Sequence, residues 1–127
     1  MELKDYFEGR KGVGVLATAD SEGKVDAAVF ARPHVLPDGT VAFIMHDRLT
    51  HHNLQSNPNA AFLFVEEGEG YKGKRLFLTK VREEEESELL YSLRRRSYPK
   101  EAELQGGSKF LVVFKVDKEL PLVGGGE

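Results

Sequence analysis

Hydrophobic positions in this chain come in short runs that alternate with polar positions, a pattern typical of β-strands. Six such runs are rich in valine, leucine, phenylalanine and alanine, and turn residues such as glycine, proline and aspartate bound them. They cover residues 13–19, 24–31, 40–46, 59–66, 74–82 and 108–116. Each run is shorter than a core helix, so the pattern predicts six strands.

Tight turns separate the first three predicted strands. Residues 20–23 are Asp-Ser-Glu-Gly and residues 37–39 are Pro-Asp-Gly, and both sequences favour a chain reversal. Strands joined by such short turns pair antiparallel, because parallel strands need a longer crossover. The sequence therefore predicts a mainly β fold with short helices, which could close into a small barrel and so remove its exposed edges. The apolar density of residues 24–31 predicts a strand buried on both faces.

Three helices are predicted around these strands. A short apolar spacing places the first within residues 1–10. The second follows Thr50 as its N-cap and stops at the Ser-Asn-Pro sequence of residues 56–58. The third and longest covers residues 83–98, with glutamates at its start and arginines at its end, as the helix dipole favours. Pro99 ends it.

Composition narrows the class of protein. The chain has 127 residues, of which 31% are charged, and a net charge of −3, which suits one globular domain over residues 1–127 with a tail at 118–127. The absence of cysteine excludes disulfides, thiolate metal sites and cysteine nucleophiles. No apolar run approaches the roughly 18 residues of a membrane span, and the start lacks the apolar core of a signal peptide. We therefore expect a cytoplasmic protein without a membrane or nucleic-acid partner.

The most informative stretch for chemistry is residues 46–54, where a predicted strand ends and a helix begins. A helix start exposes unpaired N–H donors and a partial positive charge, and both favour a phosphate. Arg48 can add a bidentate cationic contact, and Thr50 a hydroxyl donor. The alternative interpretation is an ordinary helix cap beside a solvated arginine.

Metal binding and hydrolysis find little support in the sequence. His51 and His52 are adjacent, so on a helix they point about 100° apart and cannot share an ion. His34 and His46 lie in other segments, and one of the histidines beside a bound ligand is the more plausible role. No nucleophile motif of the Gly-x-Ser-x-Gly type occurs. The glycine-rich residues 68–73 lack the ending of a P-loop and are interpreted as a loop that could cover a ligand.

The order of these segments carries a family resemblance. The segments are Gly-Val-Gly-Val-Leu-Ala-Thr at 12–18, Ala-Ala-Val-Phe-Ala at 27–31, Val-Ala-Phe-Ile-Met-His at 41–46, Arg-Leu-Thr-His-His-Asn-Leu-Gln-Ser-Asn-Pro at 48–58 and Ala-Ala-Phe-Leu-Phe at 60–64. In this order the chain resembles the FMN-binding split β-barrel proteins related to pyridoxamine 5′-phosphate oxidase, over residues 10–117. The resemblance implies a six-stranded antiparallel split β-barrel of Greek-key type.

The resemblance also implies a homodimer with two FMN sites at the subunit interface. By position, the flavin ring would lie against the second and third strands, at Ala28, Val29, Phe30, Ala31, Ile44, Met45 and His46. The phosphate would lie at the following helix start, at Arg48, Leu49 and Thr50, with Asn53 one turn later. A residue of the fifth strand, Lys74 or Arg75, would reach the flavin.

Two departures from the family pattern shape the expected function. Larger members often carry an Arg-Lys pair at the phosphate, whereas Leu49 and Thr50 stand there in this chain and leave Arg48 as the main cation. The chain also ends near Leu122 without the segment that binds pyridoxine phosphate in true oxidases, so oxidation of that vitamer is not expected. The nearer likeness is to short bacterial FMN-binding proteins.

The expected function is therefore that of an FMN flavoprotein, either a small oxidoreductase or an electron carrier, with NAD(P)H or a redox protein as donor. The cofactor would perform the redox step, and the protein would orient it. Two alternatives remain open at this point. The same fold could bind a deazaflavin or haem, or it could be a binding module without enzymatic activity.

Overall fold

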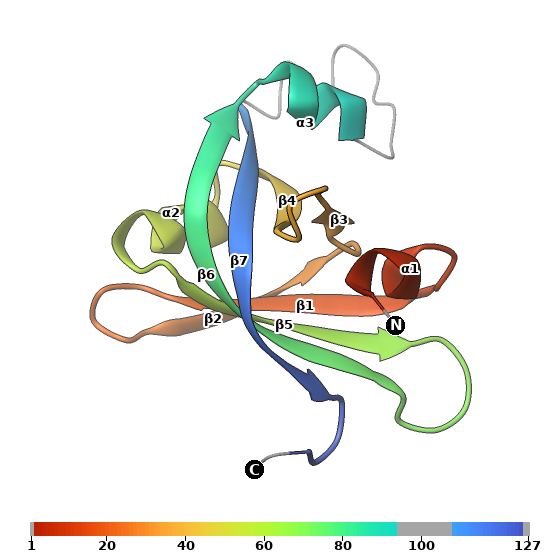
Figure 1. Ribbon diagram of the computed structural model, residues 1–127. Coiled ribbons are helices and arrows are strands. Elements are labelled where there is room, and N and C mark those ends of the chain that lie inside the picture. Colours follow the sequence, from red (N-terminus) through yellow and green to blue (C-terminus); the bar gives the residue numbers. More distant parts are fainter. Residues whose placement is uncertain (1, 94–107, 126–127) are drawn as a thin grey trace.

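One antiparallel sheet of seven strands forms the body of the protein (Figure 1). The computed structural model describes residues 2–93 and 108–125. Along the chain the elements are α1 (Leu3–Phe7), β1 (Gly12–Ala19), β2 (Val25–Phe30), β3 (His34–Val35), β4 (Val41–His46), α2 (Leu49–Ser56), β5 (Asn59–Glu66), β6 (Gly73–Glu85), α3 (Glu88–Leu93) and β7 (Lys109–Pro121). The strand order in the sheet is β2-β1-β5-β6-β7-β4-β3.

The sheet curls because its two longest strands bend. β6 and β7 pair along their length, and their register shifts between Phe77 and Leu78 and again between Lys80 and Arg82. Such bulges bend a strand and increase its twist. In Figure 1 β6 and β7 rise from the layer of β1, β2 and β5 to the level of β4. The result is a curled half-barrel, which confirms the predicted mainly β split-barrel fold with short helices.

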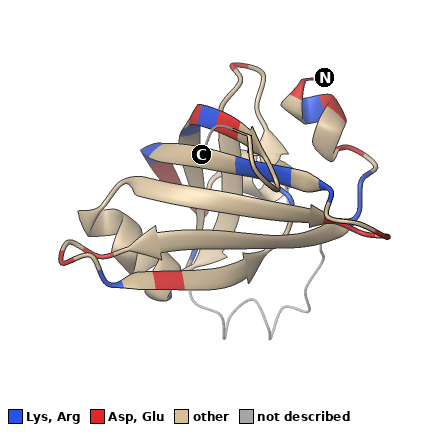
Figure 2. Ribbon diagram, turned by 90° about the horizontal axis from the view of Figure 1, so that it is seen from below, with Lys and Arg blue, Asp and Glu red and all other residues tan. Residues whose placement is uncertain are grey.

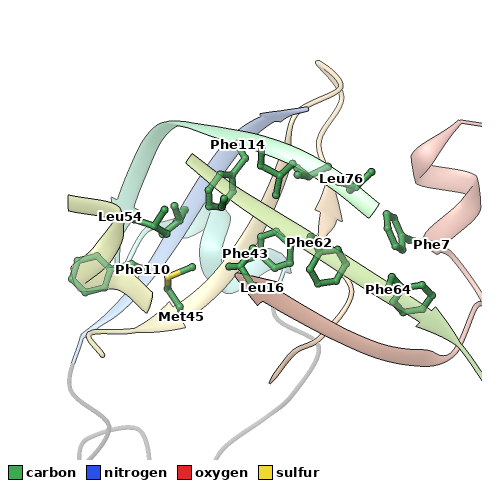
Figure 3. Close-up of a cluster of buried hydrophobic side chains, with 14 of the residues drawn as sticks. Phe7, Leu16, Phe43, Met45, Leu54, Phe62, Phe64, Leu76, Phe110 and Phe114 are labelled. Carbon is green, nitrogen blue, oxygen red and sulfur yellow. The ribbon is translucent and has the colours of Figure 1, made fainter. Parts of the chain in front are cut away.

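The core fills the inside of this curl. Residues of even number in β1, β5 and the first half of β6, up to Leu78, point inward, as the alternation of a strand requires. Figure 3 shows these side chains directed toward one another between the layers. The cluster contains Phe7, Leu16, Phe43, Met45, Leu54, Phe62, Phe64, Leu76, Phe110 and Phe114, all buried. The ring of Phe43 bridges the layers, since it contacts Phe62 at 5.0 Å and Phe114 at 5.8 Å between ring centroids.

Most predicted strands and the second helix are confirmed, with two differences in the region from β3 to the start of α2. The chain forms one further strand, β3, whose two residues pair with Val41 and Ala42 of β4. The N-cap of α2 is Arg48 and not Thr50, so the prediction for Thr50 was wrong by two positions. Thr50 instead lies in the first turn of the helix, where its side chain is buried.

The prediction of a helix over residues 83–98 was wrong at its start. β6 continues to Glu85, with Glu83 opposite Val112 and Glu85 opposite Phe110 of β7. The helix α3 begins at Glu88, and residues 94–107 lie outside the described part of the chain. Pairing with β7 overrides the helix preference of the glutamates, because the long partner strand supplies backbone hydrogen bonds to this segment. β7 likewise runs to Pro121 and takes up part of the predicted tail.

The second strand is not buried on both faces as predicted. In β2 the side chains of Val25 and Val29 are 84% and 76% exposed. They lie on the outer face of the sheet, whereas Phe30 turns inward and packs against Phe43. The outer apolar side chains of β2 therefore have no covering element within the described residues.

Candidate functional site

A pocket of about 830 Å³ lies between β2 and β4, and the start of α2 forms one end of it. This volume falls within the roughly 300–1,000 Å³ of typical small-molecule and cofactor sites. Its lining along the strands is mostly apolar, with Asp26, His34 and His46 as the exceptions, and it is more polar at the end near α2. The lining residues are Asp26, Ala28, Val29, Phe30, Ala31, Arg32, His34, Phe43, Ile44, Met45, His46, Arg48, Leu49, Thr50 and Lys109.

The two strands that form the walls offer backbone groups to a ligand. β2 is an edge of the sheet, so one side of it has no strand neighbour in the described structure. β4 pairs with β3 only at Val41 and Ala42, so among the described residues its last four, from Phe43 to His46, pair with β7 alone. Strand edges present rows of N–H and C=O groups. The walls can therefore hydrogen-bond the rim of a flat polar ring.

The start of α2 supplies the polar end of the pocket. Arg48 has extended backbone angles and an exposed side chain, and its carbonyl accepts the N–H of His52. The first-turn N–H groups of α2 have no carbonyl inside the helix to bond. Their partial positive charge adds to the guanidinium of Arg48. This end of the pocket is built to receive an anion.

Two buried polar side chains at this end make no hydrogen bond to the described part of the protein. Thr50 is 6% exposed and Lys109 is 4% exposed, and both line the pocket. Every fully enclosed side-chain nitrogen or oxygen in the described residues has a hydrogen-bond partner. The Thr50 hydroxyl and the Lys109 ammonium have no such partner, so each keeps some accessible surface, and both residues line the pocket.

Other ionisable groups in the pocket are already engaged or lie along its walls. Arg32 donates to the carbonyl oxygens of Phe7 and Arg10, at 2.7 and 2.6 Å, and so holds the chain between α1 and β1. His34 and His46 each add an imidazole to the lining. Arg48 and Lys109 are thus the two lining cations whose side chains the structure does not join to a carboxylate or a carbonyl.

A cluster of polar groups fixes α2 to β6 beneath the pocket. The His51 ring lies between two carboxylates, with Nδ1 2.9 Å from Asp47 and Nε2 3.0 Å from Glu83, and it stacks on Phe110. Burial on its own raises the pKa of Glu83, but hydrogen bonds from Gln55, Lys80 and His51 outweigh it and lower the pKa to about 2. Glu83 is therefore ionised at neutral pH and holds the helix in place.

The structure brings most of the predicted site residues together. Ala28, Val29, Phe30, Ala31, Ile44, Met45, His46, Arg48, Leu49 and Thr50 all line the one pocket. Asn53 does not: its amide nitrogen lies 3.1 Å from the Thr18 hydroxyl, and it faces β1 instead. Asn53 is one turn beyond Leu49 and Thr50, and that turn rotates it toward the sheet.

Lys74 and Arg75 also lie away from this pocket. Lys74 pairs with Glu119 and lies over the Tyr6 ring, and Arg75 donates to the carbonyl oxygens of Pro121 and Gly124. Both residues are at the start of β6, whereas the half of the strand nearer α2 is the one around Glu83. Within one copy of the chain neither residue is in the pocket lining.

Sequence reasoning missed five lining residues. They are Asp26, Arg32, His34, Phe43 and Lys109. Asp26 shares the inward face of β2 with Ala28, so strand alternation contained a signal for it. Lys109 comes into the pocket because β7 pairs with β4 and places it opposite His46. No local pattern contains that long-range pairing.

Within residues 2–93 and 108–125, no three histidine, aspartate or glutamate side chains lie close enough to hold a metal ion. None of the helices in these residues combines the length and the apolar character that a membrane span needs.

Comparison with known proteins identifies the fold. A scan of the sequence against protein-family models and a search of curated proteins gave no match. Among solved structures, the chain is similar to an FMN-binding protein from Syntrophomonas wolfei, with a TM-score of 0.74, 21% identity, and coverage of 97% of this chain and 85% of that one.

Two further solved structures resemble the chain. HutZ, the haem storage protein from Vibrio cholerae, gives a TM-score of 0.65 at 18% identity, with 94% of this chain and 92% of that one covered. An F420 reductase gives 0.61 at 16% identity, with 91% and 94% covered. Proteins of this fold thus include an FMN-binding protein, an F420 reductase and a haem storage protein. The chain has the split β-barrel fold of the FMN-binding proteins related to pyridoxamine 5′-phosphate oxidase.

Proposed function

We propose that this protein binds FMN in the pocket between β2 and β4 and acts as a small FMN-dependent oxidoreductase or electron carrier. The observation that carries the proposal is the start of α2. There the exposed side chain of Arg48, the buried hydroxyl of Thr50 and the first-turn N–H groups lie at one end of a largely apolar pocket. The Thr50 hydroxyl has no hydrogen-bond partner among the described residues. A flavin mononucleotide has the same division into a flat ring and a phosphate.

The residues present fit such a cofactor. The edges of β2 and β4 would bind the ring rim through Ala28, Val29, Phe30 and Ala31 on one side and Ile44, Met45 and His46 on the other. Arg48, Leu49 and Thr50 would hold the phosphate. Bound FMN supplies the redox chemistry, and the protein orients the ring and excludes water from its faces. The donor expected on chemical grounds is NAD(P)H or a redox protein.

The outer face of the sheet supports the homodimer that the resemblance implies. Its side chains are apolar across three strands and part of a fourth, and none of them is fully buried: Val13, Val15, Ala17, Ala19, Val25, Ala27, Val29, Ala61, Leu63, Val65 and Phe77. Figure 2 looks onto this face, whose strands show few charged segments. A contiguous apolar patch of this kind marks an interaction surface.

We take the occupant of this face to be a second copy of the chain. The face is continuous with the pocket, because Val29 belongs to both. Arg75 is the register partner of Leu63 and so lies on the same face. In a dimer built on this face, Arg75 would therefore contact a flavin bound in the pocket of the partner subunit and not one bound in its own.

A haem protein is the second candidate, because two imidazoles, those of His34 and His46, line the pocket. Imidazole is a common axial ligand of haem iron. The apolar walls would suit a porphyrin as well as a flavin, and the cations Arg48 and Lys109 could pair with propionates.

Equilibrium titration of the cofactor-free protein with FMN, a deazaflavin and haem tests the proposal. Flavin fluorescence reports the first two, and the haem absorption band reports the third. We expect saturable FMN binding at one site per chain, tighter than that of the other two. Tighter binding of haem, with a shifted absorption band, would support the haem candidate instead. Failure to bind any of the three would overturn the assignment of the pocket.

A further inference from the structure

Lys109 is an unusual residue for its position. It is the first residue of β7, opposite His46 of β4, and the residue is only 4% exposed. Lysine is almost never fully buried unless it is paired with an opposite charge. A buried ammonium group therefore needs an explanation from its surroundings.

The carboxylate of Glu86, which contacts the main chain of Lys109, forms no ion pair with its ammonium group. Glu86 lies close, but one of its oxygens accepts the backbone N–H of Lys109 at 2.7 Å and the other accepts the hydroxyl of Tyr91. The backbone N–H of Glu86 in turn donates to the carbonyl of Lys109 at 2.9 Å. Glu86 thus anchors the main chain of Lys109, while the ammonium lies 5.9 Å from the centre of the Tyr91 ring.

Backbone geometry supports this assignment of Glu86. It has a φ of 49°, which makes it the one non-glycine residue with positive φ in the described chain. That conformation is unfavourable for a side-chain-bearing residue and persists where surrounding contacts enforce it. Here the contacts to Lys109 and Tyr91 do so. The start of β7 is therefore held in place through its main chain, and the Lys109 side chain remains available to a ligand in the pocket.

The formal charges in the pocket lining can be compared with the charge of the phosphate in the proposed ligand. A phosphate monoester has a charge of about −1.5 to −2 at neutral pH. Arg48 supplies one positive charge and a helix start about half of one, while the Asp26 side chain in the same lining carries one formal negative charge. Arg32 is engaged by carbonyl oxygens, so Lys109 is the remaining lining cation that can complete the balance.

We infer that Lys109 is a second phosphate-binding cation, and that it makes the pocket prefer a phosphate monoester over an uncharged ligand with the same ring. The inference rests on the proposed function, since it names the residue that sets the specificity of the proposed FMN site. Riboflavin is the matched probe, because it has the ring of FMN without the phosphate. Lys109 should therefore affect FMN and leave riboflavin nearly untouched.

The test compares FMN and riboflavin affinities in three variants, measured by flavin fluorescence. Lys109→Met removes the charge and keeps the length of the side chain, and Lys109→Gln is a second neutral variant in case the first does not fold. Lys109→Arg keeps the charge. Lys115→Met is the matched control, because Lys115 lies on the same strand with an exposed side chain. Thermal melting checks that each variant is folded.

We expect the neutral variants to lose about 10- to 100-fold in FMN affinity, the range that one charge-assisted hydrogen bond spans. Riboflavin affinity should change less than about threefold in all of them, and Lys109→Arg and the Lys115 control should stay near the wild type. Equal FMN affinity in wild type and folded neutral variants would overturn the role of Lys109 while leaving the FMN site intact. If the wild type binds no FMN, the proposed function fails and this inference fails with it.

Discussion

At the scale of single residues, Arg48 and Thr50 differ in how they reach the pocket. Arg48 is exposed, so its charge is available without desolvation, whereas Thr50 is buried and offers a hydroxyl that the described protein does not use. The sequence already indicated both as hydrogen-bond donors to a bound phosphate. It placed the helix cap at Thr50, because a hydroxyl residue is the commoner N-cap, and the extended backbone of Arg48 takes that position instead.

The double variant Arg48→Ala with Thr50→Ala should weaken FMN binding at least tenfold. It removes the guanidinium and the hydroxyl, and a single charge-assisted hydrogen bond contributes about 1.5–3 kcal/mol. Fluorescence titration measures the change. Arg82→Ala is the control, because Arg82 is an exposed arginine outside the pocket lining. Superimposable curves for the wild type and the double variant would place the phosphate elsewhere.

Gly14 is the residue whose substitution should disturb the core beneath β2. A Cβ at this position would lie 2.5 Å from the carbonyl oxygen of Phe30 and 2.5 Å from the ring of Phe62. We expect Gly14→Ala to reduce the free energy of unfolding by about 1–3 kcal/mol, because backbone atoms must shift to admit it. Denaturant unfolding measures this loss. A variant as stable as the wild type would mean that β1 and β2 separate more easily than the packing implies.

At the scale of elements, the sequence predicted strands more reliably than helix boundaries. The alternation of apolar and polar residues at 40–46 and 59–66 predicts only a strand in each case, and the structure confirms both strands. The glutamates of residues 83–86 fit either a helix start or the end of an edge-like strand, and what decides is the partner. That partner is β7, more than twenty residues away, which local propensity does not contain.

The contacts that attach α2 to β6 should weaken at acid pH. The pKa of Glu83 is lowered to about 2 in the folded protein. Its contribution to stability is therefore present above the ordinary glutamate range near 4.5 and is lost as pH falls from about 5 to about 2. With allowance for the partial exposure of this carboxylate, we expect a loss of about 1–2 kcal/mol over that window. Denaturant unfolding across the pH range measures it.

Glu83→Gln is the matched variant for this effect. It keeps the shape of the side chain and removes the group that titrates. The variant should be less stable at neutral pH and should show a shallower decline between pH 5 and pH 2. Parallel pH profiles for the variant and the wild type would show that other carboxylates cause the acid sensitivity.

At the scale of the whole molecule, the sheet order creates the pocket. β2 and β4 are far apart in the strand order of the sheet, but the curl of β6 and β7 brings both strands to the walls of one pocket. The resemblance predicted ten of the lining residues, because its motifs lie on β2, β4 and the start of α2. It could not predict Lys109, which depends on the pairing of β7 with β4. It placed Lys74 and Arg75 near the flavin, and in a single chain they lie elsewhere.

The outer sheet face should hold two copies together. Val13→Asp places a charge on that face, outside the pocket lining, and should shift the protein from dimer toward monomer. Burying an unpaired carboxylate in an apolar interface is strongly unfavourable. Light scattering at micromolar concentration measures the mass. Val123→Asp is the control, because Val123 is also an exposed valine but lies near the C-terminus beyond β7. A monomeric wild type would contradict the dimer.

The central claim is that this split barrel is a flavoprotein with FMN in the pocket at the start of α2. The most direct measurement is the visible absorption spectrum of the purified protein, followed by release of the chromophore with heat and its identification by chromatography. The account predicts a flavin spectrum and released FMN in a ratio near one per chain. A colourless protein that also fails to take up added FMN would contradict the account.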